Sequence, residues 1–187
     1  ICYVIDQRLN THMKRYTVIT TFNQQGLDKY GQRCISTFEQ FWPAEVDLVV
    51  YTEKCTPRIT KPNVKCIDLI ANSKHCKRFI KRHKNNPEAN GGIGPHNEHI
   101  WKPNKHFKWQ GLRFSYKVFS IYHAMQNIDT EWVIWLDADT LTHSTITMDF
   151  LDSVSPKDCV ITHLGRGERY HSECGWVGYN KTNPMCT

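Results

Sequence analysis

Two aspartates separated by one residue, Asp137 and Asp139, directly follow an uninterrupted apolar run in EWVIWLDADTL, residues 131–141. Carboxylates two positions apart on an extended chain emerge on the same side, so both can face one ion. Their mutual repulsion favours a bound cation, and oxygen ligands suit Mg²⁺ or Mn²⁺, whose remaining ligands are commonly substrate phosphates. The pair therefore predicts a metal site that holds a phosphorylated ligand; the alternative is an aspartate pair that caps the following loop.

A cationic helix is expected before this apolar run. In LRFSYKVFSIYHAMQNI, residues 112–128, apolar side chains recur three or four positions apart, which predicts a helix. Arg113 and Lys117 are four residues apart and so share one face of it. If that face lies beside the strand, both cations can reach a diphosphate held at the aspartates. Otherwise they are ordinary surface residues.

The rest of the chain alternates strands with helices. We expect strands over 16–22, 46–52, 63–70 and 158–164, helices over 24–42, 72–84 and 147–154, and a short glycine-punctuated apolar stretch over 172–180. The strands are continuously apolar, Trp132–Leu136 above all, which is typical of strands buried on both faces of a mostly parallel sheet. The expected fold class is therefore α/β, a three-layer sandwich, in a single domain over residues 1–187.

Composition indicates a globular protein without a membrane span. Hydrophobic residues make up 40% and charged residues 22% of the 187, and no apolar run approaches the roughly 18 residues that a span needs. The N-terminus lacks a signal layout. The eight cysteines include no C-x-x-C pair, so we expect no zinc site but reduced thiols, with Cys34, Cys66 and Cys159 as small buried apolar groups. A cytoplasmic location is the corresponding expectation.

The ends of the chain suggest a fragment. The sequence begins with Ile1 and stops at NPMCT, just after an apolar stretch. We therefore expect the single domain to be incomplete at its C-terminus.

The net charge of +6 is concentrated in residues 73–84 and 101–109. A solvated helix face followed by a loop accounts for it, and so does attraction of an anionic partner such as a nucleotide diphosphate or an acidic acceptor. No nucleic-acid-binding motif accompanies the charge, so nucleic acid is not an expected partner.

Residues 85–111 are rich in asparagine, glycine and proline and predict a long loop. Loops of this length in compact domains are often functional. We expect this one to be mobile without ligand and to fold over a bound nucleotide, with Trp101, Phe107 and Trp109 closing on it.

The stretch FSYKVFSIYHAMQNIDTEWVIWLDADTL, residues 114–141, resembles the helix–strand–DxD core of GT-A glycosyltransferases, most of all the retaining glycogenin-type, family 8-like group. VITTFN, LVVYTE and ECGWVGYN resemble the same fold in order and spacing. The resemblance implies a Rossmann-like nucleotide-diphospho-sugar transferase that depends on Mn²⁺ or Mg²⁺ at Asp137 and Asp139. Its donor would be a nucleotide-diphosphate sugar, and its acceptor is open, with a glycan or a lipid-linked sugar as candidates.

The resemblance also implies which residues contact the donor and the acceptor. Those on the donor side are Thr20, Thr21, Phe22, Asn23, Thr52, Glu53, Arg113, Lys117, Asp137, Ala138 and Asp139. Lys117 would help to stabilise the departing nucleoside diphosphate. The stretch from Glu173 to Tyr179 would line the sugar and acceptor side. Glu173 would act as base if the reaction inverts or position the acceptor if it retains, and a plain loop residue is an equal alternative.

One feature of the glycogenin-type group is missing. That group takes a third metal ligand, a histidine, from a later segment that this chain does not contain. His163 lies in HLGRGERYH, which does not reproduce the pattern, and a loop histidine is the simpler interpretation. The stereochemical outcome and the activity of this chain are therefore open.

Three other interpretations remain. A haloacid dehalogenase-type phosphatase also uses D-x-D after an apolar strand, but its threonine follows two residues later, whereas Thr140 follows Asp139 directly. A nucleotidyltransferase usually carries a glycine-rich basic loop after its first strand, and residues 20–31 contain only two glycines. A non-catalytic or inactive fragment that binds a sugar nucleotide is compatible with every motif above.

Overall fold

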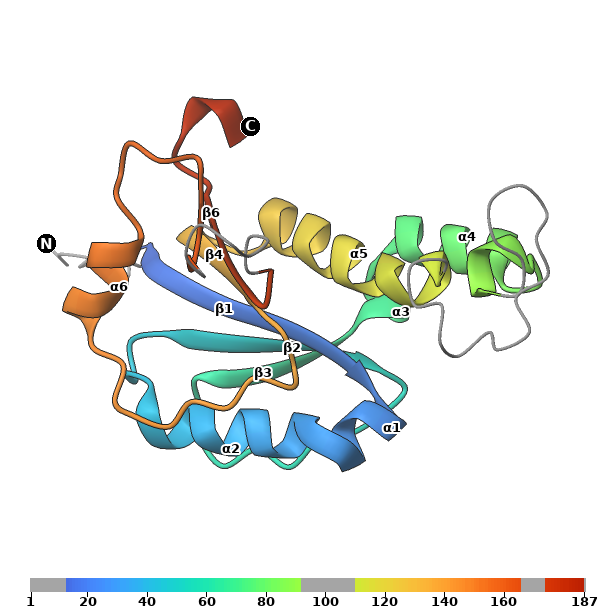
Figure 1. The fold of residues 1–187 in the computed structure, drawn as a ribbon, viewed down its shortest axis with the longest axis horizontal. Helices are drawn as coiled ribbons and strands as arrows, with labels where there is room; N and C mark the ends of the chain where they lie inside the picture. Colours follow the sequence, from blue (N-terminus) through green and yellow to red (C-terminus); the bar gives the residue numbers. More distant parts are fainter. Residues whose placement is uncertain (1–12, 92–109, 166–173, 187) are drawn as a thin grey trace, which may run out of the picture.

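The computed structural model describes residues 13–91, 110–165 and 174–186, which form a six-stranded sheet between two layers of helices (Figure 1). The strands are β1 (Lys14–Asn23), β2 (Asp47–Glu53), β3 (Val64–Asp68), β4 (Thr130–Leu136), β5 (Ile161–His163) and β6 (Trp176–Asn180). The longer helices are α2 (Gln32–Phe41), α4 (Lys74–His83), α5 (Gly111–Asn127) and α6 (Met148–Val154). The short turns are α1 (Gln24–Gly26), η1 (Leu27–Gly31), α3 (Leu69–Asn72), η2 (Glu88–Asn90) and η6 (Pro184–Cys186).

The strand order is β3-β2-β1-β4-β6-β5, and β6 alone runs antiparallel to its neighbours. The chain proceeds from β1 outward to β2 and β3, and then returns to place β4 on the other side of β1. The carboxyl ends of β1 and β4 therefore flank the switch point at which ligands bind in open α/β sheets. The three-layer α/β fold predicted from the sequence is confirmed.

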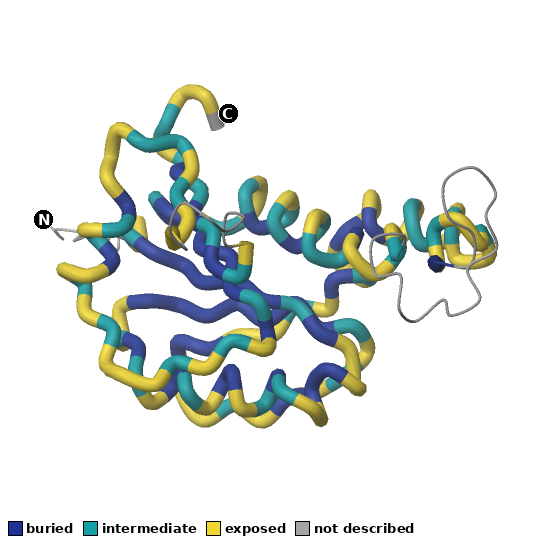
Figure 2. Tube along the Cα trace, viewed as in Figure 1, coloured by how far each residue is buried: buried dark blue, intermediate teal, exposed yellow. Residues whose placement is uncertain are grey.

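Each face of the sheet supports its own core. Tyr16, Val18 and Ile134 pack with Phe38 of α2, whereas Ile19 and other residues of the opposite face pack under α3, α4 and α5. The buried trace in Figure 2 follows the central strands. Every residue from 132 to 136 is at most 3% exposed, which confirms that this strand is buried on both faces.

Side-chain caps determine where four helical segments begin. Asn23, Asp68, Ser73 and Thr147 each accept a hydrogen bond from the backbone N–H three residues ahead. Such caps satisfy N–H groups that the first helical turn leaves without an intrahelical partner. The caps of α1 and α3, Asn23 and Asp68, are the last residues of β1 and β3, so the chain turns sharply at the carboxyl edge of the sheet.

Several predicted elements differ from the observed ones. The long helix expected over 24–42 is interrupted by the π-turn η1. The strand expected over 158–164 is limited to the three residues of β5, because a turn occupies Pro156 to Cys159. Within the stretch expected over 172–180, residues Trp176–Asn180 form an internal antiparallel strand. Trp101, Phe107 and Trp109, expected in a closing loop, lie outside the described residues.

Six cysteines are free thiols: Cys34, Cys55, Cys66, Cys76, Cys159 and Cys174. Cys34 is buried as expected, and burial raises the pKa of its thiol to about 12. Cys66 is exposed, contrary to expectation, because β3 is an edge strand with most of its residues facing solvent. None of the helices in the described part of the chain is long and apolar enough to cross a membrane.

Replacing Gly31 by alanine should destabilise the fold. An added Cβ would lie 2.9 Å from two ring carbons of Phe22, which is itself only 3% exposed and so has little room to move. Overpacking of this kind costs about 1 to 3 kcal/mol, more than the helix propensity gained from alanine. Thermal denaturation should show a melting temperature several degrees lower.

Gly111→Ala is the matched control, because the nearest atom to its added Cβ is the Ala89 carbonyl oxygen at 3.8 Å. It should leave the melting temperature equal or slightly higher. Equal losses in the two variants would contradict the packing argument.

Candidate active site

Asp137 and Asp139 lie just beyond the carboxyl end of β4, where the backbone holds them in a fixed turn. The N–H of Asp137 donates to the Gly175 carbonyl at 2.7 Å, and the N–H of Thr140 donates to the Asp137 carbonyl at 2.9 Å. Ala138 between them is buried, whereas Asp139 is exposed. The rigid strand thus presents both carboxylates at the switch point of the sheet.

One oxygen of Asp137 is already occupied by two donors. Its Oδ1 accepts from Lys117 Nζ at 3.1 Å and from the Trp135 indole N–H at 2.6 Å. Lys117 Nζ also donates to the Cys174 carbonyl at 2.8 Å and lies 4.8 Å from the centroid of the Trp135 ring. These contacts place a positive charge beside the aspartates, and a lysine ammonium has three donors. One donor of Lys117 therefore remains for a ligand.

The donor set fits Mg²⁺ or Mn²⁺. The Asp139 side chain forms no hydrogen bond or ion pair with any described residue, so both its oxygens are available for coordination. Mg²⁺ is commonly held by one or two carboxylates together with water and substrate phosphates. No group of three or more His, Cys, Asp or Glu residues suited to a metal occurs in the described ranges. A metal at Asp137 and Asp139 would take water and the phosphates of a ligand as its further ligands.

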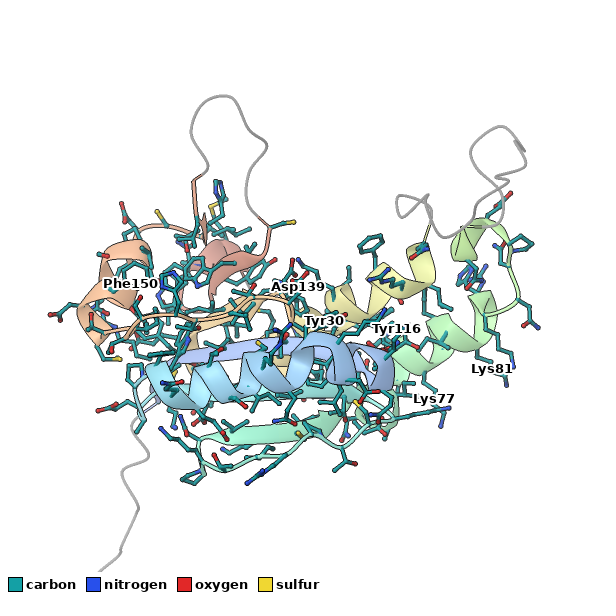
Figure 3. All side chains as sticks on the ribbon, turned by 60° about the horizontal axis from the view of Figure 1, so that its bottom comes forward. Tyr30, Lys77, Lys81, Tyr116, Asp139 and Phe150 are labelled. Atoms are coloured by element: carbon teal, nitrogen blue, oxygen red, sulfur yellow. The ribbon has the colours of Figure 1, made fainter. Side chains whose placement is uncertain are left out.

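A cavity of about 850 Å³ opens beside the aspartates, a size typical of small-molecule sites. It reaches from Asp137 and Asp139 across the end of β1 to Glu53 at the end of β2. Tyr30, Tyr116 and Asp139, labelled in Figure 3, all line it. Its basic residues are Lys29, Arg113 and Lys117. Because neighbouring strands lie about 4.8 Å apart and β1 lies between β2 and β4, the ends of β2 and β4 are roughly 10 Å from each other.

Glu53 forms the far end of this cavity. Burial raises the pKa of its carboxyl to about 7, against the opposing effects of a hydrogen bond from Thr21 and the charge of Arg113. The Thr21 hydroxyl donates to the Tyr51 carbonyl at 2.7 Å, and its oxygen lies 3.4 Å from Glu53 Oε1. Near neutral pH this group can therefore accept a hydrogen bond as a carboxylate or donate one as an acid.

A second cavity, of about 500 Å³, lies on the other side of the aspartates. It is lined by Leu136, Asp137, Asp139, Thr140, Leu164, Gly175 and Trp176. Asp137 and Asp139 are common to both cavities. A group held by the aspartates is therefore accessible from two sides.

The structure brings most of the predicted donor residues together. Thr21, Phe22, Asn23, Glu53, Arg113, Lys117 and Ala138 line the first cavity with the aspartates. Thr20 and Thr52 do not line either cavity, because both are buried in the sheet. Asn23 has a structural role as well, since its Oδ1 caps α1 by accepting from the Gly26 N–H at 2.9 Å.

The predictions for the acceptor side have mixed outcomes. Glu173 lies outside the described residues. Gly175 and Trp176 line the second cavity, whereas Val177 and Tyr179 pack under the helices on one face of the sheet. His163 is exposed at the end of β5 and does not join the aspartates in a metal-binding group among the described residues.

The sequence did not lead us to predict the contacts that Trp135 and Cys174 make with Asp137 and Lys117. Trp135 precedes Asp137 by two residues, so strand alternation alone places the two side chains on one face, and this signal could have been used. Cys174 contributes its backbone carbonyl to Lys117, and no residue type marks such a contact in a sequence.

A scan against protein-family models finds no match, and a sequence search of curated proteins finds none either. Among solved structures, the fold is similar to the apo form of the WbbM bifunctional glycosyltransferase, with a TM-score of 0.49 and 11% identity over 92% of this chain. It is also similar to the apo form of mouse xyloside xylosyltransferase 1, with a TM-score of 0.49 and 12% identity over 92% of this chain.

The chain spans 32% of the length of the first of these proteins and 70% of the second. Likeness at this level carries no information about the activity of this chain.

Proposed function

We propose that this protein is a metal-dependent glycosyltransferase that moves a sugar from a nucleotide-diphosphate donor to an acceptor. The observation that carries the proposal is the position of Asp137 and Asp139 between two cavities. A donor in the larger cavity would place its diphosphate at the aspartates and its nucleoside toward Glu53. Its sugar would then face an acceptor in the smaller cavity.

The side chains present suit the departure of a nucleoside diphosphate. A divalent ion at the aspartates would neutralise part of the negative charge on the leaving group. Lys117 is held by Asp137, the Cys174 carbonyl and the Trp135 ring, so its charge is positioned in advance of the reaction. Arg113 lies one helical turn away on the same face and lines the same cavity.

The proposal also includes a residue that would contact the acceptor hydroxyl. Among the described residues that line the two cavities, the carboxylates are Glu53, Asp137 and Asp139. The first is at the nucleoside end and the other two hold the metal in this proposal. Glu173, which lies outside the described residues, keeps the role that the resemblance implies toward the acceptor hydroxyl, as base in an inverting reaction or as a positioning group in a retaining one, with a plain loop residue as an equal alternative. The glycogenin-type assignment and a glycan or lipid-linked acceptor are parts of the same proposal.

Thermal denaturation with a panel of nucleoside diphosphates and their sugars, each with and without Mn²⁺, tests the proposal. A ligand at 100 times its dissociation constant stabilises by about 2.7 kcal/mol, which corresponds to roughly 5 to 10 °C for a chain of this size. We expect that shift only when metal and nucleotide are both present. No shift with any nucleotide in the presence of metal would contradict the proposal.

A second measurement separates an enzyme from a protein that only binds its ligand. The nucleotide sugar that stabilises the protein should release free nucleoside diphosphate, slowly with water and faster with an acceptor. If a nucleotide sugar stabilises the protein but no nucleoside diphosphate is released, the protein binds sugar nucleotides without turning them over.

A further inference from the structure

One short segment, α4 with the residues that flank it, has a positive charge equal to the net charge of the whole protein. The chain contains 24 lysines and arginines and 18 aspartates and glutamates, and residues 73–84 hold six of the basic residues and none of the acidic ones. The other 175 residues therefore have 18 of each sign and are neutral overall. The segment is therefore a strong candidate for attracting an anionic partner.

The six basic side chains of this segment are exposed, and none forms an ion pair with a described residue. The opposite face of α4 packs against the protein: Cys76 is buried, and the ring of Phe79 lies 5.5 Å from that of Phe119 on α5. Lys77 and Lys81, labelled in Figure 3, project from the outer side of the helix. The cations thus cover one side of a docked helix about 15 Å long.

An exposed apolar stripe lies on the neighbouring helix. Phe114, Val118 and Tyr122 are 45%, 61% and 47% exposed and follow one another at intervals of four residues along α5, so they share one face. Val118 and Tyr122 line neither of the two cavities described above. The stripe therefore borders the larger cavity at Phe114 and extends beyond it along α5.

The stripe and the cations adjoin each other. The ring of His75 on α4 lies 5.6 Å from that of Tyr122 in an edge-on contact. Arg78 and Arg82 are three and seven residues beyond His75, so they lie on the same side of α4. Two arginines therefore border the apolar stripe, and the lysines of α4 extend the positive surface beyond them.

We infer that this two-helix surface, formed by the cations of α4 and the stripe of α5, binds the anionic face of a lipid bilayer. Anionic headgroups attract basic residues close to the membrane, and apolar or aromatic side chains lodge in the boundary below the headgroups. A soluble polyanion would satisfy the cations alone. The bilayer accounts for the exposed apolar stripe as well.

The inference does not depend on the proposed reaction. It has one consequence for that reaction, because Phe114 belongs both to the stripe and to the lining of the larger cavity. A protein docked through this surface would open its donor cavity close to the membrane.

Co-sedimentation of the 187-residue chain with vesicles tests the inference. Vesicles of phosphatidylcholine mixed with phosphatidylserine should bind the protein, with an affinity that falls as salt is added, and vesicles of phosphatidylcholine alone should bind it far less. Each basic residue near an anionic surface is worth about fivefold in binding. Arg78→Glu with Arg82→Glu should therefore weaken binding at least about 25-fold.

Two further variants make the test specific. Val118→Ser with Tyr122→Ser removes the stripe without changing charge and should weaken binding about tenfold. Arg58→Glu with Lys157→Glu makes the same change of net charge at exposed sites elsewhere and should have little effect. All variants should melt at the wild-type temperature.

Absence of binding to anionic vesicles would overturn the inference. Loss of binding in the arginine variant with no loss in the Val118 and Tyr122 variant would assign the surface to a soluble polyanion instead. If the arginine variant and its control lose vesicle binding equally, the binding depends only on the net charge of the protein. That result would likewise overturn the inference.

Discussion

Replacing Asp139 by asparagine should weaken the binding of a nucleotide diphosphate by roughly tenfold or more while leaving the fold intact. The change removes one charge-assisted contact to a metal, worth about 1.5 to 3 kcal/mol. Asp139 is exposed and makes no hydrogen bond with a described residue, so the structure loses nothing. Relief of the repulsion between two close carboxylates should leave the metal-free protein as stable as before or slightly more so.

Asp137→Asn should behave differently. Asp137 is only 35% exposed and pairs with Lys117, so this variant should lose melting temperature in addition to ligand affinity. Asp158→Asn, at an exposed site after α6, is the control and should change neither quantity.

Calorimetric titration with metal present and absent, together with a thermal melt, measures both effects. A lower melting temperature in Asp139→Asn with unchanged diphosphate affinity would make the pair a structural cap of its loop. The proposed function would then lose its main support.

The apolar strand and the acidic pair could be predicted because their signals are local. An unbroken run of large apolar residues from 132 to 136 has few solutions other than a strand buried on both faces, and the aspartates necessarily stand at its end. The helix with Arg113 and Lys117 was similarly evident from its periodicity. These elements are enough to locate the site at one edge of the sheet.

What could not be predicted depends on contacts between distant parts of the chain. The antiparallel insertion of β6 follows from its pairing with β4, forty or more residues earlier, and Gly178 within it weakens the strand pattern. The raised pKa of Glu53 arises from burial at the end of β2. The bond from Lys117 to the Cys174 carbonyl joins residues 57 positions apart. None of these relations leaves a periodic or compositional trace.

Lys117→Met should change the affinities for metal and for nucleotide in opposite directions. In the free protein the ammonium shares Asp137 Oδ1 with the Trp135 indole at hydrogen-bonding distance, and its charge opposes a cation at the same carboxylate. A unit charge a few ångströms away is worth about 1 to 4 kcal/mol at the dielectric of a protein surface. Removing it should raise the affinity for Mn²⁺ alone by roughly tenfold.

The same substitution should weaken nucleotide-diphosphate binding in saturating Mn²⁺ by roughly 10- to 100-fold, because a charge-assisted hydrogen bond to the phosphates is lost. Methionine keeps the length and apolar stem of lysine, so its sulfur and methyl group can still cover the Trp135 ring. Lys29→Met removes a charge from the same cavity, and Lys29 forms no ion pair with either aspartate. It should leave the affinity for metal alone unchanged and reduce nucleotide affinity less than Lys117→Met does.

Titration of each variant first with Mn²⁺ and then with nucleotide separates the two effects. Unchanged affinity for metal alone in Lys117→Met would mean that Lys117 does not compete for Asp137, and unchanged nucleotide affinity would remove it from the donor site.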